Sequence, residues 1–364
     1  MQRQGKILAI VIVAMVALLT LWASKLGNEK KNTNTERSTF TEEDAALRYP
    51  YMTLNEKERE LYETLYDAMT AHAMTVELPH TYTEGEYERV YLMVRMQEPQ
   101  FFYVSTLYQL SENMSDTMIQ YDIDEDGSEE MTRELNEAAD EILDGIPSDA
   151  SEWETVLYIH DEIVKRCTYI DGANSSTAYG CLVDGMALCE GYAKAFTYLT
   201  RRMGMDVMCI PGEQSDGENH VWNIVKADGA YYNVDVTWDD NSDLRGAVSH
   251  RYLTLPDERF GKHYADSRMF IPPACTTNNL QYYQERGLVL GEYTQAKGSV
   301  GAWAAMHEDT DRMIEFYCSS PVTYSQIIDD LENGSELISA IAPYSDGQGQ
   351  FFKEPESQII TIIF

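Results

Sequence analysis

The chain of 364 residues carries 27 Lys or Arg and 61 Asp or Glu, which gives a formal net charge of −34. The charge is uneven, because the first 38 residues hold six basic and two acidic side chains and the remainder holds 21 and 59. Such an acidic body repels phosphates, which argues against nucleic acid and anionic lipid headgroups as partners. It either attracts cationic substrates or simply keeps the surface solvated.

The amino terminus has the pattern of a membrane signal. Arg3 and Lys6 precede the apolar run Ile7–Trp22, whose 16 residues span about 24 Å as a helix, less than the ~30 Å hydrocarbon core. We expect a signal anchor over residues 1–24, or alternatively a cleaved signal peptide, followed by a flexible stalk over 25–50. The basic head predicts a single-pass cell-membrane protein with its body outside the cell, or a secreted protein if the segment is cleaved.

Residues 51–148 have the patterns of an N-terminal lobe of helices and strands. Thr53 and Glu56 have the spacing of a capping box before a helix. Further helices are expected at Tyr87–Met96 and Ser128–Leu143, and strands at Phe101–Tyr108 and Met118–Ile123.

An acidic stretch in this lobe matches the start of a calcium loop. Asp122, Asp124, Asp126 and Gly127 fit D-x-D-x-D-G, but Arg133 stands at the twelfth position, where a bidentate Glu belongs. We therefore interpret the stretch as an acidic turn before a helix.

Residues 149–287 hold the side chains that carry chemistry. Ser151–Cys167 has the periodicity of an amphipathic helix, in which we interpret His160 as a packing or hydrogen-bonding residue. A second helical stripe runs from Cys189 to Met203, and Gly204 is a favoured residue after a helix end. Cys189 thus begins a helix, at the end of the dipole that favours negative charge.

The six cysteines form neither a CxxC pair nor a cluster at zinc-ligand spacing. A disulfide framework is not expected in so large a chain, although one pair stays open.

A hairpin follows the cysteine helix. His220–Lys226 and Tyr231–Thr237 flank Asp228-Gly229, a favoured two-residue turn. In that register Ala227 faces Ala230. Moving away from the turn, opposite residues of the two strands then point to the same face of the hairpin, and successive residues alternate between its two faces. His220 and Asp235 then become diagonal neighbours on one face, which a loop one residue longer or shorter would prevent.

A thiol at a helix start, a histidine and a carboxylate are the groups that thiol acyl transfer needs. At this point the sequence resembles the transglutaminase-like superfamily, through YGCLVDGMALCEGYAKAF, NHVWNIVKADGAYYNVDVTWDD and WETVLYIHDEIVKRCTY. The resemblance covers about Ser151 to Tyr283. It implies an α+β fold, with a papain-like core in which the nucleophile helix packs on an antiparallel sheet, and no required cofactor or metal.

Carried over by position, the resemblance implies Cys189 as nucleophile, His220 as base and Asp235 as the group that orients the base. A second oxyanion donor does not carry over. Papain-like enzymes use a glutamine shortly before the nucleophile, which this chain lacks, and Trp153 and Tyr179 are the remaining options.

After the hairpin, Tyr252–Pro256 has the pattern of a strand that returns to the core sheet. Residues 288–364 are expected to form a small C-terminal α+β region, with strands at Met313–Cys318 and Ile359–Phe364 and a helix at Tyr324–Leu331. We recognise no catalytic or ligand-binding motif in that region.

The sequence therefore predicts an extracytoplasmic cysteine enzyme that cleaves or exchanges peptide or isopeptide amides in a protein or peptide substrate. The thioester on Cys189 is resolved by water, as in a peptidase or amidase, or by an amine, as in a transglutaminase. We favour water, because no lysine-accepting site is evident. The alternative is a non-catalytic cell-surface binding or scaffold protein that retains the fold. Oligomeric state is not predicted.

Overall fold

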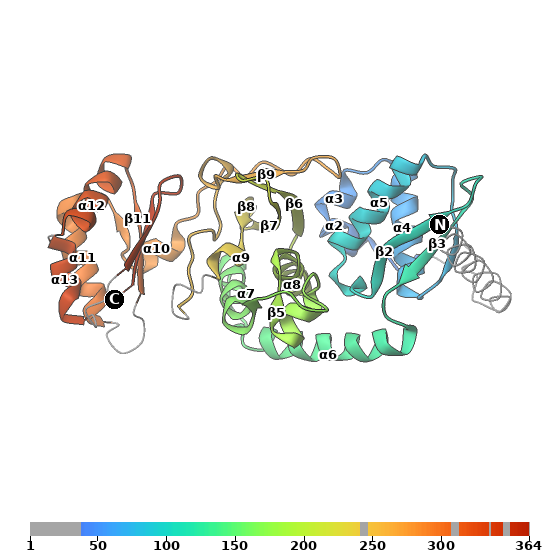
Figure 1. The fold of residues 1–364 in the computed structure, drawn as a ribbon, viewed down its shortest axis with the longest axis horizontal. Helices are drawn as coiled ribbons and strands as arrows, with labels where there is room; N and C mark the ends of the chain where they lie inside the picture. Colours follow the sequence, from blue (N-terminus) through green and yellow to red (C-terminus); the bar gives the residue numbers. More distant parts are fainter. Residues whose placement is uncertain (1–37, 241–246, 307–312, 335, 345–349, 364) are drawn as a thin grey trace, which may run out of the picture.

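The computed structural model describes residues 38–240, 247–306, 313–334, 336–344 and 350–363. The expected signal anchor over 1–24 lies outside these residues. Within the described ranges no helix combines the length and apolarity needed to cross a bilayer. The chain forms an N-terminal lobe, a central core and a C-terminal unit, which follow one another along the long axis of the molecule (Figure 1).

The stalk expected over 25–50 ends earlier than predicted. Helix α2 (Glu42–Ala46) begins at Thr41 with a capping box, and α3 (Tyr49–Met52) follows it. The ring of Phe40 packs on Tyr51 and Tyr62 with centroids 4.8 and 5.5 Å away. Burial of these aromatic rings orders the chain from about residue 40.

The N-terminal lobe packs helices on a small antiparallel sheet. Helices α4 (Glu56–Thr70) and α5 (Glu84–Gln97) lie against β1 (Thr75–Glu77), β3 (Asp116–Tyr121) and β2 (Val104–Leu110), in the order β1-β3-β2. The capping box of α4 was predicted two residues too early, since it joins Asn55 to Glu58. The Thr53 hydroxyl instead donates to the Pro50 carbonyl.

The acidic stretch begins a helix, as the sequence predicts. Asp124 caps α6 (Glu125–Leu143), and its carboxylate accepts from the Gly127 N–H at 2.9 Å. Leu135 and Ile142 are buried against the core, so α6 runs along the core and links it to the N-terminal lobe (Figure 1).

The core places helices against one antiparallel sheet. Helices α7 (Glu152–Arg166) and α8 (Cys189–Arg202) pack together and against the sheet order β8-β7-β6-β9. The strands are β6 (Val207–Gln214), β7 (Asn219–Ala227), β8 (Ala230–Val234) and β9 (His263–Ala265). Beside them β4 (Thr168–Tyr169) pairs in parallel with β5 (Met186–Ala187), and the π-helical turn η2 (Gly180–Asp184) connects to the latter.

The hairpin has the predicted register but a shorter second strand. Ala227 pairs with Ala230 and Asn223 with Val234. Strand β8 then ends, and α9 (Val236–Asp239) replaces the strand predicted up to Thr237, because the Asp235 carboxylate accepts from the Trp238 N–H at 3.2 Å and starts a helical turn.

The strand expected at 252–256 is reduced to one isolated bridge between Asn233 and Leu255. Thr254 has a φ of 53°, a left-handed backbone angle that interrupts an extended strand. The segment still contacts the site, since the Asp235 N–H donates to the Tyr252 carbonyl at 3.0 Å.

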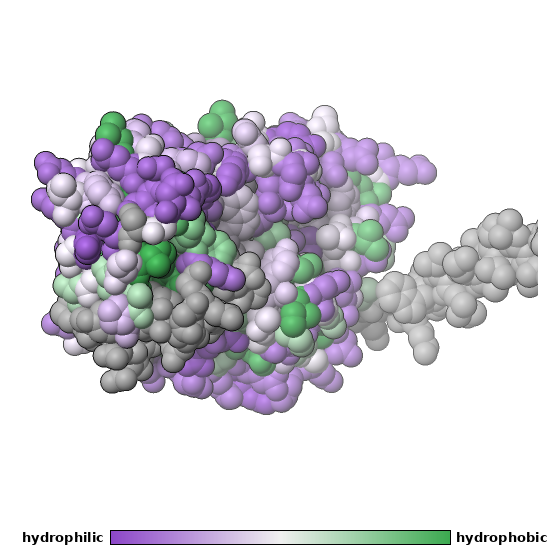
Figure 2. Space-filling model, turned by 60° about the vertical axis from the view of Figure 1, so that its left-hand side comes forward, coloured by the Kyte–Doolittle hydropathy of each residue, from purple (hydrophilic) through white to green (hydrophobic). Residues whose placement is uncertain are grey.

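The C-terminal unit has its own hydrophobic core, which already includes Tyr283 on α10 (Gln281–Glu285). Its sheet has the order β10-β11-β13-β12, and helices α11, α12 and α13 cover one face (Figure 1). Figure 2 shows that hydrophilic residues cover most of the face turned toward the reader. The elements are β10 (Val289–Leu290), α11 (Tyr293–Met306), β11 (Met313–Cys318), α12 (Pro321–Asn333), α13 (Glu336–Ile341), β12 (Gln350–Glu354) and β13 (Ile359–Ile363).

Candidate active site

Cys189 is the first residue of α8, and the chain before it is tightly held. The Leu188 N–H donates to the Ser175 carbonyl at 2.8 Å. A Cβ on Gly191 would lie only 2.4 Å from the same carbonyl oxygen, so this turn of α8 needs a glycine. Cys189 is partly exposed, whereas the other five cysteines are buried, and all six thiols are free.

A buried amide fixes α8 on the sheet that carries the histidine. The Asn223 side chain, on β7, donates to the Ala193 carbonyl at 3.0 Å and to the Thr197 hydroxyl at 2.9 Å, both on α8. Since His220 lies on the same strand, this contact fixes the distance between the histidine and the helix start.

His220 and Asp235 lie in contact. His220 Nε2 is 2.7 Å from Asp235 Oδ2, and the two side chains are 2% and 0% exposed. Because Nε2 is committed to Asp235, Nδ1 is the nitrogen available to Cys189. Burial lowers the pKa of His220, but the Asp235 charge and the hydrogen bonds to Asp235 and Cys189 outweigh it and raise this pKa to about 10. The structure thus brings His220 and Asp235 into contact, and Cys189 at the start of α8 is close enough to contribute to the raised pKa of His220.

Asp235 has a second histidine partner that the sequence reasoning missed. His263 Nε2 lies 2.9 Å from Asp235 Oδ2, and its Nδ1 lies 3.0 and 3.1 Å from the Phe260 and Gly261 carbonyl oxygens. Burial opposes ionisation of Asp235, yet His220 and His263 hold its pKa well below the usual range. His263 is 28 residues from Asp235, and no local pattern marks it.

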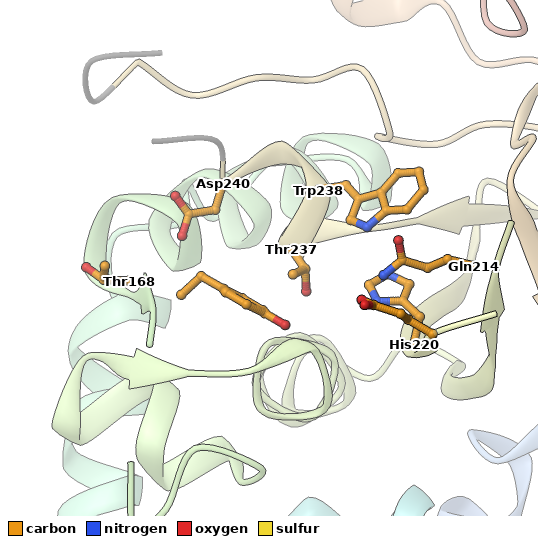
Figure 3. Close-up of a pocket in the computed structure, with 8 residues that line it drawn as sticks. Thr168, Gln214, His220, Thr237, Trp238 and Asp240 are labelled. Carbon is orange, nitrogen blue, oxygen red and sulfur yellow. The ribbon is translucent and has the colours of Figure 1, made fainter. Parts of the chain in front are cut away.

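A cavity of about 520 Å³ opens beside this cluster. Figure 3 shows His220, Gln214 and Trp238 on one side of it and Thr168 and Asp240 on the other. Its remaining lining residues are Tyr169, Glu218 and Thr237. Two carboxyl groups and no Lys or Arg line the cavity, which favours neutral or cationic substrate groups.

The two options for a second oxyanion donor lie elsewhere. The Tyr179 hydroxyl donates to Glu134, and Trp153 is buried at 1% exposure within α7. Tyr169 lines the cavity instead, and its pKa is raised by burial and then by the charge of Cys189. Its position directly after α7 offers no sequence signal for this role.

A second histidine cluster lies behind the site. The buried ring of His160 contacts Asp161 at 3.0 Å and Asp239 at 3.1 Å, in agreement with the predicted hydrogen-bonding role. Burial lowers the pKa of His160, but these two hydrogen bonds raise it to about 9. His250 reaches the same Asp161 oxygen at 2.9 Å.

Two groups among the described residues have the composition of a metal site, namely His160 with Asp161 and His250, and His220 with Asp235 and His263. In both groups the histidine nitrogens already contact carboxylate oxygens at hydrogen-bond distance. The arrangement is that of His–carboxylate pairs, and we assign no metal to either group.

Comparison with known proteins agrees with this geometry. Residues 136–236 match the family model of the transglutaminase-like superfamily, which confirms the resemblance seen in the sequence. The superfamily includes cysteine proteases and acyltransferases, and its members are typically cysteine-dependent enzymes. No curated protein sequence matches the chain.

Two of the solved structures that match the chain illustrate the similarity. A “putative cysteine protease” from Cytophaga hutchinsonii is 20% identical, over 32% of this chain and 43% of that protein, with a TM-score of 0.25. A TGase is 11% identical, over 65% of this chain and 67% of that one, with a TM-score of 0.29. The chain thus spans less than half of the Cytophaga protein. At these TM-scores the superpositions are loose, so the site is interpreted from its own geometry.

Proposed function

We propose that this chain is a cysteine acyl-transfer enzyme that acts on peptide or isopeptide amides through a thioester on Cys189. The observation that carries the proposal is the position of His220, which contacts Asp235 at the edge of an open cavity and whose raised pKa is due in part to Cys189. Nδ1 of His220 takes the thiol proton, and the thiolate attacks the amide carbon. The resulting imidazolium gives its proton to the leaving amine as the C–N bond breaks. Asp235 orients the ring and stabilises its charge.

Two donors can stabilise the oxyanion. The backbone N–H of Cys189 belongs to the first turn of α8, whose N–H groups have no acceptor within the helix. The second donor is the Tyr169 hydroxyl, since Tyr169 lines the same cavity as His220. A hydrogen bond to an anionic oxygen is stronger than one to a neutral carbonyl, so this hydroxyl favours the oxyanion in the transition state over the ground-state carbonyl.

We favour water as the acceptor of the acyl group. The cavity of about 520 Å³ exceeds the volume of one water molecule many times, and Thr168, Gln214 and Thr237 supply polar lining. Water then attacks the thioester carbonyl with His220 as base, which releases the acid and restores the thiol. Transamidation is the second candidate, since Glu218 and Asp240 can attract an amine acceptor.

We further propose that the enzyme works at the outer face of the cell membrane on protein or peptide substrates, or in the medium if its amino terminus is cleaved. The support is the basic head and apolar run of residues 1–24 and the acidic body that follows them. A non-catalytic scaffold is the alternative.

A protein substrate with a labelled primary amine tests these functions together. Casein is incubated with the full chain and the amine, and new amino termini, released ammonia and incorporated label are measured. Cleavage or ammonia release that disappears in Cys189→Ala, but persists in the matched control Cys318→Ala, supports hydrolysis. Label in glutamine side chains would instead establish transamidation. If no product depends on Cys189, the enzyme proposal fails and the scaffold alternative stands.

A further inference from the structure

His263 lies outside residues 136–236 and has no role in the steps above, yet it contacts the carboxylate on which they depend. Its Nε2 is 2.9 Å from Asp235 Oδ2, the same oxygen that His220 reaches at 2.7 Å. The His263 side chain is 1% exposed. One carboxylate oxygen therefore lies at hydrogen-bond distance from two buried imidazoles.

Both ring nitrogens of His263 face only hydrogen-bond acceptors. Nδ1 faces the Phe260 and Gly261 carbonyl oxygens at 3.0 and 3.1 Å, and Nε2 faces Asp235. A carbonyl and an ionised carboxylate accept hydrogen bonds and cannot donate them. All three contacts are hydrogen bonds only when both nitrogens of His263 carry a proton.

Aromatic rings surround His263 on its remaining sides. The Phe260 ring is stacked on it with centroids 3.9 Å apart and an interplanar angle of 24°. Trp238 and Trp222 lie 4.3 and 5.1 Å away. The faces of aromatic rings attract cations, so this enclosure stabilises a charged imidazole.

We propose that His263 is a positioning residue of the active site. As a cation, His263 holds Asp235 in place and shares the carboxylate charge with His220. The proposal rests on the function proposed above. The centroids of the two histidine rings are 5.5 Å apart, so a charge on His263 also opposes a proton on His220. Both effects make His220 a stronger acid, which helps it to give its proton to a leaving amine.

Few other titratable groups face this ring among the described residues. Asp235, the N-cap of α9, contacts the His263 ring, and His220 approaches it from β7. The centroid of the Tyr252 ring lies 5.9 Å from that of His263. Cys189 acts from the start of α8 through its effect on the pKa of His220. The pH dependence of Cys189 therefore reports on His263 through His220.

The test is the pH dependence of Cys189 alkylation by iodoacetamide, measured by mass spectrometry in the full chain. A thiol paired with an imidazolium reacts at low pH, and its rate rises a second time where the imidazolium loses its proton. His263→Gln keeps an N–H donor for Asp235 but removes the charge, and we expect it to move the second rise upward by about one pH unit. His80→Gln is the matched control, since His80 is exposed and contacts Glu60 and Tyr82 in the N-terminal lobe. Imidazole added to His263→Ala should restore the wild-type profile.

The outcomes separate the two proposals. An ordinary thiol profile in the wild-type chain overturns the proposed function and the role of His263 with it. A paired profile in the wild type that is unchanged in His263→Gln overturns the role of His263 alone. If the Gln variant does not fold and imidazole fails to restore the Ala variant, His263 is structural only and the proposal is wrong.

Discussion

Replacing Asp235 by Asn removes the charge that holds the His220 proton and that His263 also contacts. The amide has the shape of the carboxylate, and its oxygen can still accept from the Trp238 N–H, so the cap of α9 is retained. The amide nitrogen can then face His220 Nε2 as a donor. That contact would put the imidazole proton on Nδ1, the nitrogen that must accept the thiol proton.

The magnitude follows from the 2.7 Å contact between His220 and Asp235. Two unit charges at this distance attract each other by about 6 kcal/mol at an effective dielectric constant of about 20, which corresponds to roughly four pKa units. Burial of His220 offsets part of this, in keeping with a pKa of about 10 against the ordinary 6.5. Without the charge, burial dominates, and we expect the pKa of His220 to fall to about 6.5 or lower.

The assay is an NMR titration of ¹³C-labelled histidine, with His220 assigned by loss of its signal in His220→Gln. Turnover of an amide substrate should fall by about 10⁴-fold, the loss known for the same replacement in serine proteases. The stability effect has a fixed sign. A histidine with a raised folded-state pKa stabilises the fold fully below its unfolded pKa of about 6.5 and loses this effect as the pH rises through about 10. The depressed pKa of Asp235 contributes stability that is fully present only above its unfolded pKa of about 4, so Asp235→Asn should destabilise the chain most between about pH 4 and 6.5. A His220 pKa that stays near 10 in the variant would refute the electrostatic account.

Two further replacements test the buried ion pair that joins the N-terminal lobe to α8 and the second oxyanion donor. Glu98→Gln leaves the buried guanidinium groups of Arg48 and Arg201 without their carboxylate, which lies 2.6 and 3.3 Å away, and should lower the free energy of urea unfolding by about 3–5 kcal/mol. The exposed Glu137→Gln serves as its control, and equal losses would contradict the role of this ion pair between the N-terminal lobe and α8. Tyr169→Phe should lower kcat by about 10²–10³-fold with little change in KM. A change confined to KM would show that Tyr169 only binds substrate.

The hairpin shows how much of the site can be predicted from local turn and strand patterns in the sequence. Asp228-Gly229 determines the turn and therefore the register, and the register correctly brings His220 and Asp235 together. The same reasoning extended the strand to Thr237, because period-two alternation does not reveal that the Asp235 side chain caps a helical turn. The contact was predicted for a cross-strand pair and is made instead from the end of a strand.

His263 and Tyr169 could not be found from local patterns. His263 reaches Asp235 across 28 residues and through a segment of irregular backbone, so its position depends on tertiary packing. Tyr169 joins the cavity because β4 pairs in parallel with β5, a two-residue contact too short to leave a periodicity. The flexible stalk was overextended for a similar reason, since Arg48 is ordered by Glu98, 50 residues away.

The central claim is that His220 activates Cys189. The most direct measurement is the rate at which iodoacetamide alkylates Cys189 at about pH 6, in the wild-type chain and in His220→Ala. We predict that wild-type Cys189 reacts at least about tenfold faster than an ordinary thiol and that His220→Ala abolishes this excess. Equal rates in the two chains would contradict the account.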